Sequence, residues 1–183
     1  MLHSSILPTP VAHPFHLTIP QRQVIRMAET CFRGEEKAGA FRIWKSPKDV
    51  VGDERVKTKL VAAIQAFLSG KPEPCTHRIM IEHETWVGWA STVPLSDLPQ
   101  NVVLREFGPN ANTRAMLVED KSVPAPKTKL ITFVCEVRQS LGAWDFVVHS
   151  LYPGQNVPLG VHGKPRTIPP MEAVFFGWEN PGA

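Results

Sequence analysis

Two histidines in a strand-like segment are the first candidates for chemistry in this sequence. His77 and His83 lie six residues apart in a segment of alternating character, so both are expected on the same side of a sheet. Histidine ordinarily titrates near neutrality, which suits proton transfer by a general acid or base. The structural alternative is that one is a surface histidine at a strand end and the other a hydrogen-bonded sheet residue.

A second group of polar side chains lies in the predicted hairpin over 129–151. Arg138 comes just before the turn, and Ser150 and Tyr152 share one face of the returning strand by alternation, which places His149 on the other face. The alternative is that Ser150 is a strand residue near a turn and Tyr152 a half-buried anchor.

Imidazole, guanidinium and hydroxyl groups gathered on one face of the sheet would suit cleavage of an RNA phosphodiester. A 2′-hydroxyl must lose a proton, a pentacovalent phosphorane must be stabilised, and the leaving oxygen must gain a proton. Arginine supplies a bidentate positive charge for the phosphate. The sequence therefore predicts that His77, His83, Arg138, Ser150 and Tyr152 line one shared site.

Signatures of metal or cofactor enzymes are absent from the sequence, which has no phosphate-binding glycine loop, dinucleotide fingerprint or H-E-x-x-H. Cys75, His77 and His83 are the only local group of metal-capable side chains, and they are too few for a closed zinc site. We therefore expect no cofactor and no metal. The three cysteines are widely spaced and odd in number, which favours free thiols in a reducing, cytoplasmic location.

Helical patterns that must position these groups occur in the first part of the chain. Apolar residues at helical spacing predict one helix from about Pro20 to Gly34 and a second from the N-cap Asp53 to Gly70. The segment 38–44 is ambiguous between strand and helical turn, and Ser46-Pro47 predicts a break. The apolar stripe of the second helix is Val56, Leu60, Ala63, Ile64, Phe67 and Leu68.

After Pro74 the period of the apolar pattern changes to two, which is typical of strands. A strand is predicted at 77–83, with 86–91 as its continuation or its hairpin partner. Further strands are predicted near 102–104, 115–118, 129–137, 144–151 and 173–178, and the segment 129–137 is expected to be a central strand buried on both faces. We therefore expect an α+β fold with N-terminal helices packed on an antiparallel sheet of about five to seven strands. The helices would occupy 20–72 and the sheet 76–178 of a single domain at 20–183, preceded by an extended arm at 1–19.

Composition supports a globular protein. The 183 residues are 43% hydrophobic and 20% charged, and no apolar stretch approaches a membrane span, so we expect neither a transmembrane segment nor a signal peptide. The net charge is +3, but residues 1–72 hold 11 Lys/Arg against 6 Asp/Glu, whereas residues 73–183 hold 9 against 11. This segregation favours a positive helical layer that would attract phosphates or an acidic partner, or else a solvated helix surface.

The strand at 144–153, with the letters WDFVVHSLYP, resembles one found in the barnase–EndoU–colicin–RelE group of small RNase toxins, whose strand often ends Trp-x-Val-Val-Thr-x-Tyr-Pro. The segment 134–138 is similar to their arginine-bearing strand. The resemblance implies helices before a curved antiparallel sheet and a metal-independent, toxin-like endoribonuclease. It would make His83 or His77 the base or acid, Arg138 the phosphate clamp, and Ser150 and Tyr152 supporting hydroxyls.

Two other functions remain open. Five tryptophans and nine phenylalanines among many prolines also suit a non-catalytic interaction module. Its contacts would come from Trp86, Trp89 and the N-terminal arm. A small-molecule pocket between helices and sheet is a third possibility. The expected partners are RNA, and a cognate inhibitor or another protein.

Overall fold

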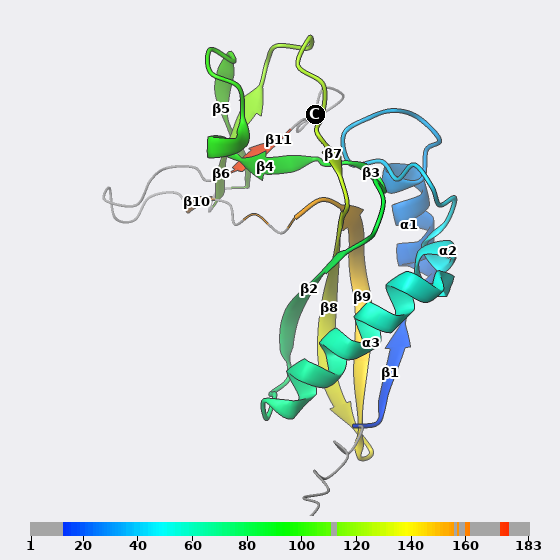
Figure 1. Ribbon diagram of the computed structural model, residues 1–183. Helices are drawn as coiled ribbons and strands as arrows, with labels where there is room; N and C mark the ends of the chain where they lie inside the picture. The colour runs from blue at the N-terminus through cyan, green and yellow to red at the C-terminus, as the bar shows by residue number, and fades with distance from the viewer. Residues whose placement is uncertain (1–12, 111–112, 156, 158–159, 162–172, 176–183) are drawn as a thin grey trace, which may run out of the picture.

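Three α-helices of the described chain lie against one face of a four-stranded sheet, and smaller sheets continue beyond one end of it (Figure 1). The computed structural model describes residues 13–110, 113–155, 157, 160–161 and 173–175. Only one strand, β1, precedes the three helices in the described chain, and all the other strands follow them. The predicted α+β class is therefore confirmed.

The helices are α1 (Gln21–Cys31), α2 (Pro47–Gly52) and α3 (Glu54–Ser69). The predicted N-cap of α3 is confirmed, because the Asp53 side chain accepts a hydrogen bond from the backbone N–H of Arg55. The sequence predicts only a break at Ser46-Pro47, but this pair begins α2. The Ser46 hydroxyl accepts from the Asp49 N–H, and Pro47 occupies the first turn, where no N–H is needed.

The main sheet has the strand order β1 (Phe15–Thr18), β9 (Ala143–Pro153), β8 (Leu130–Ser140) and β2 (Cys75–Glu82). β8 and β9 form the predicted antiparallel hairpin, and β2 pairs antiparallel with the other side of β8. The hairpin turn consists of Leu141 and Gly142, which both have positive φ, as a two-residue turn between twisted strands requires. β1 pairs parallel with β9, so the sheet is mixed.

One face of this sheet, which we call the covered face, packs against the three helices. Its centre is formed by Phe133, Phe146, Val148 and Leu151, all fully buried. α3 crosses the sheet diagonally (Figure 1). The opposite face, which we call the open face, has no helix over it within the described chain.

The remaining strands lie beyond the upper end of the main sheet in Figure 1. A two-stranded sheet joins β3 (Gly88–Trp89) to β7 (Lys127–Thr128). A five-stranded sheet contains β4 (Thr92–Pro94), β5 (Leu104–Asn110), β6 (Thr113–Val118), β10 (Gly160–Val161) and β11 (Ala173–Phe175), and η1 (Leu95–Asp97) follows β4.

The strands predicted to form one sheet over 76–178 are thus divided among three sheets. Part of the reason lies at Gly88, where the chain passes very close to another backbone segment. A Cβ at this position would come within 2.2 Å of the Ala40 carbonyl oxygen, so β3 is held against residues 40–41 and turns away from the line of β2.

Two other predictions differ from the structure. Residues 15–18 of the predicted arm form β1, because Phe15 and Leu17 alternate onto the covered face and pack against the core; residues 1–12 lie outside the described residues. The strand predicted at 129–137 to be buried on both faces is fully buried only on the covered face, because Val134 and Glu136 on the open face of β8 are half-buried. None of the described helices has the length and apolar character needed to cross a membrane.

Candidate functional site

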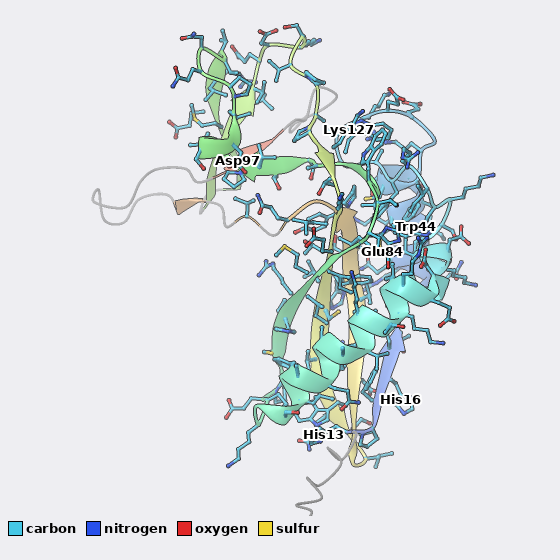
Figure 2. The ribbon with its side chains drawn as sticks, viewed as in Figure 1. His13, His16, Trp44, Glu84, Asp97 and Lys127 are labelled. Atoms are coloured by element: carbon cyan, nitrogen blue, oxygen red, sulfur yellow. The ribbon has the colours of Figure 1, made fainter. Side chains whose placement is uncertain are left out.

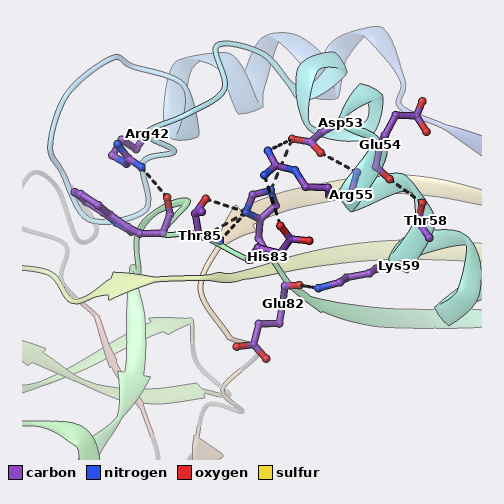
Figure 3. A network of polar contacts seen from close by, with 11 residues as sticks. Arg42, Asp53, Glu54, Arg55, Thr58, Lys59, Glu82, His83 and Thr85 are labelled. Atoms are coloured by element: carbon purple, nitrogen blue, oxygen red, sulfur yellow. Dashed lines mark hydrogen bonds and ion pairs between the residues drawn. The ribbon is translucent and has the colours of Figure 1, made fainter.

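His83 is buried under the helices on the covered face. It is 2% exposed, and the edge of its ring contacts Trp44 with ring centroids 5.4 Å apart. Its Nδ1 accepts a hydrogen bond from the Thr85 N–H at 3.1 Å, and its Nε2 lies 3.7 Å from an Asp53 carboxylate oxygen (Figure 3). Nε2 has no hydrogen-bond partner among the described residues. His83 therefore joins the end of β2 to the N-cap of α3, and no substrate can reach it in this conformation.

His77 lies on the same covered face as His83, as the alternation predicts. Its ring stacks on Phe67 of α3 with centroids 3.9 Å apart, and burial lowers its pKa. Both histidines thus face the helices. The prediction that they share a site with Arg138, Ser150 and Tyr152 is wrong, because those three lie on strands whose corresponding side chains face the other way.

A β-bulge in β9 brings a different histidine to the open face. Val134 pairs with Ser150 and the next residue of β8, Cys135, pairs with Val148, so His149 is an extra residue with no partner in the register. The simple alternation predicts that His149 and Ser150 point to opposite faces. The bulge puts both on the open face, where His149 Nε2 lies 2.8 Å from a Glu136 carboxylate oxygen.

The Glu136 carboxylate is bound on both sides. Its other oxygen accepts from Arg138 Nε at 2.6 Å, so the carboxylate joins Arg138 to His149; we call these three residues the open-face cluster. The hydrogen bond from Arg138, followed by that from His149, lowers the pKa of Glu136 to about 2. All three side chains are partly exposed, at 56% for Arg138, 37% for Glu136 and 32% for His149.

This arrangement can move a proton. A carboxylate that accepts from Nε2–H fixes the imidazole tautomer, leaves Nδ1 as the proton acceptor and stabilises the imidazolium that forms. Arg138 uses Nε for Glu136, and its charge also interacts with Asp145, the residue opposite it on β9. No hydrogen-bond acceptor of its two Nη groups is found in the described part of the chain. These groups are thus available to a phosphate oxygen. Glu136 is not among the residues predicted from the sequence, although its alternation with Arg138 along β8 is a signal that places both on one face.

Ser150 and Tyr152 follow the cluster along the same face. Ser150 lies opposite Val134, which is two residues from Glu136 along β8 and on the same face. Tyr152 lies opposite Thr132, two residues further along β8. Burial raises the pKa of Tyr152, and this is partly offset by a hydrogen bond with the Thr132 side chain and by the nearby charge of Arg78.

The predicted hydroxyl and guanidinium groups therefore share a face but are not all close together. Arg138 and Thr132, the partner of Tyr152, are six residues apart on β8, or about 20 Å at 3.3 Å per residue. Ser150 lies between them. Arg138 and Tyr152 are too distant to bind one phosphate, whereas Arg138, Glu136 and His149 are in direct contact.

The cysteines fit structural positions rather than a site. All three are free; Cys75 is exposed, whereas Cys31 and Cys135 are buried. Burial raises the pKa of Cys31 and raises that of Cys135 to about 12. No group of three or more metal-ligating side chains that could hold an ion occurs among the described residues, and Cys75, His77 and His83 form none.

The tryptophans on which the interaction alternative depends are largely covered. Trp89 and Trp44 are 9% and 8% exposed. Trp86 is half-buried, with the Arg42 guanidinium and the Lys127 ammonium each 4.3 Å from its ring centroid. Trp178 lies outside the described residues.

A cavity of about 510 Å³ lies near the small sheets rather than between helices and main sheet. Its walls are mainly apolar, with the charged Asp97 and Lys127 among them, both in the upper part of Figure 2. Leu130 and Gln155 also line it. These two residues flank the end of the β8–β9 pair, so the cavity continues the line of Ser150 and Tyr152.

A scan against models of protein families, a search of curated proteins and a search of solved structures each found no match for this chain.

Proposed function

We propose that the protein is a metal-independent endoribonuclease that cleaves RNA on the open face of the main sheet. One observation carries the proposal: the Glu136 carboxylate is held between His149 Nε2, at 2.8 Å, and Arg138 Nε, at 2.6 Å, on a face that no described helix covers. A proton acceptor oriented by a carboxylate, beside a guanidinium, is the equipment that transfer at a phosphodiester needs.

The residues have separate roles in this reaction. His149 Nδ1 takes the proton of the 2′-hydroxyl, and the oxygen attacks the adjacent phosphorus. The bond from phosphorus to the 5′-oxygen breaks, the 5′-oxygen takes a proton from water, and a 2′,3′-cyclic phosphate remains. Glu136 positions His149, while the Nη groups of Arg138 and the Ser150 hydroxyl donate to the phosphate oxygens.

Tyr152 has a different role from the one that the resemblance implies. At its distance from Arg138 it contacts RNA beyond the scissile phosphate, where a half-buried aromatic ring offers a surface for base stacking. The cavity beside Leu130 and Gln155 extends this line and has room for a base. Substrates longer than a dinucleotide are thus expected to be cleaved faster.

The pH dependence follows from the lowered pKa of Glu136. A carboxyl group with a pKa of about 2 is ionised at every pH at which cleavage of RNA would be assayed. Glu136 therefore stays ionised between pH 4 and 8, about the range used for such assays, so its own protonation causes no loss of activity there.

The test is cleavage of labelled single-stranded RNA by the purified chain in the presence of EDTA, with detection of the 2′,3′-cyclic phosphate. His149→Ala is expected to lower the rate about 10²- to 10⁴-fold, the usual contribution of a general base. His16→Ala is the matched control, because His16 is an exposed histidine on β1, the strand next to β9, and is not part of the open-face cluster (Figure 2). A wild-type chain that cleaves no RNA, or equal losses in both variants, would contradict the proposal.

A further inference from the structure

β2 is an unpaired edge strand in the described chain. It follows β8 at the end of the order β1-β9-β8-β2. The His83 N–H donates to the Lys129 carbonyl of the strand leading into β8, and by alternation the backbone groups of Ile81, Ile79 and His77 also point to β8. The N–H and C=O groups of Thr76, Arg78, Met80 and Glu82 therefore point away from the sheet.

One of these outward groups has a partner within the chain. The Lys59 ammonium, on α3, donates to the Glu82 carbonyl oxygen (Figure 3). This contact is consistent with backbone N–H and C=O groups of the even-numbered residues of β2 that point away from β8. A long flexible lysine side chain is also a common way to protect an edge strand, and one that moves aside at small cost.

The outward side chains of β2 are complementary to the same side chains of a second copy. Met80 is 52% exposed, which is unusual for a methionine, and it lies midway between Arg78 and Glu82. Neither of these two charged side chains has an ion-pair partner among the residues that the structure describes. If two copies pair antiparallel with Met80 opposite Met80, each Arg78 lies opposite the Glu82 of the other copy, on the same face as the methionines.

We propose that β2 is a homodimer interface in which two copies pair antiparallel about Met80. The register is consistent with the backbone, because the outward groups of residues 78, 80 and 82 then meet one another as hydrogen-bonded pairs. The two four-stranded sheets become one sheet of eight strands. Facing side chains of paired strands share a face, so both open-face clusters lie on the same side of the dimer and all helices lie on the other.

A cysteine at the centre of the interface tests the register directly. In a Cys75→Ser background, Met80→Cys is expected to form an intermolecular disulfide on mild oxidation, because opposite Cα atoms in a hydrogen-bonded pair are about 5.5 Å apart. Thr76→Cys is the matched control on the same edge. Its two copies would be eight residues apart along the paired strands, or about 26 Å, and are expected not to cross-link.

Charge exchange tests the specificity. Arg78→Glu and Glu82→Arg are each expected to weaken the dimer at least about tenfold in analytical ultracentrifugation, and the double variant is expected to restore it. A wild-type chain that stays monomeric at every accessible concentration would overturn the proposal. So would a Thr76→Cys disulfide that forms as fast as the Met80→Cys disulfide, or a double variant no better than the single ones. These readouts need no RNA, so they are independent of the proposed activity.

Discussion

The two faces of the main sheet place the same type of residue in opposite surroundings. On the covered face His83 is 2% exposed and is held between Thr85 and Asp53, and His77 is stacked on Phe67. On the open face His149 has about a third of its side chain in solvent and contacts an ionised carboxylate. Histidine on the covered face thus joins structural elements, whereas on the open face it is partly exposed to solvent beside a carboxylate.

The difference comes from what packs on each face. The helices supply apolar side chains that exclude water from the covered face, so a polar group there has only protein partners, and His83 Nε2 has no hydrogen-bond partner among the described residues. The open face has no such layer in the described chain, and its polar groups can bind to one another and still reach solvent. The position of a residue relative to the helices therefore decides its role more than its type does.

The largest expected effect on stability comes from adjacent residues of β9. Phe146 is fully buried on the covered face, so Phe146→Ala is expected to lower the free energy of unfolding by about 3–5 kcal/mol. Val147 is half-buried on the open face, and Val147→Ala is expected to cost less than about 1 kcal/mol. Urea denaturation measures both, and equal losses would show that the two faces are not packed differently.

The histidines give a smaller but more specific contrast. His83→Ala is expected to destabilise the fold by about 2 kcal/mol, because it leaves a cavity and removes the acceptor of the Thr85 N–H. His149→Ala is expected to change stability by less than about 0.5 kcal/mol, as is usual for a partly exposed position. The reverse order in thermal or urea unfolding would be incompatible with the buried position of His83.

Asp53 gives the smallest effect and tests the link between α3 and β2. Asp53→Ala removes the N-cap and is expected to cost about 1 kcal/mol, whereas Asp53→Asn keeps a cap and is expected to cost less. The pKa of Asp53 is lowered, since hydrogen bonds from Arg55 and its charge outweigh the effect of burial. The carboxylate therefore stabilises the fold above pH 3.8, its ordinary pKa, and this contribution is lost as the pH falls through the lowered value.

The advantage of the wild type over Asp53→Asn should accordingly be constant near neutrality and vanish only in strong acid. Unfolding curves of both proteins across pH measure this difference. A difference that disappears at a pH well above 3.8 would show that the pKa of the carboxyl group is not lowered in the folded state.

Local patterns in the sequence were sufficient for the elements with strong signals. The stripe Val56, Leu60, Ile64 and Leu68 and the cap at Asp53 predict α3, and the β8–β9 hairpin follows from two β-prone segments around a short turn. α2 was missed because a proline read as a break is also a good first residue of a helix.

The candidate site was less accessible to prediction for a physical reason. Alternation assigns faces correctly only while the register is regular, and one extra residue at His149 reverses the assignment. Nothing local in the sequence marks that bulge. Alternation also cannot say which face the helices cover, so it does not distinguish the buried His77 and His83 from side chains on the open face such as Glu136.

The most direct test of the account compares one histidine from each face in the same assay. Cleavage rates of single-stranded RNA in EDTA are measured for the wild type, His149→Ala and His77→Ala, with folding of each variant checked by circular dichroism. The account predicts that His149→Ala loses about 10²-fold or more, whereas folded His77→Ala stays within about threefold of the wild type. A large loss in His77→Ala with full activity in His149→Ala would contradict it, because the chemistry would then belong to the covered face.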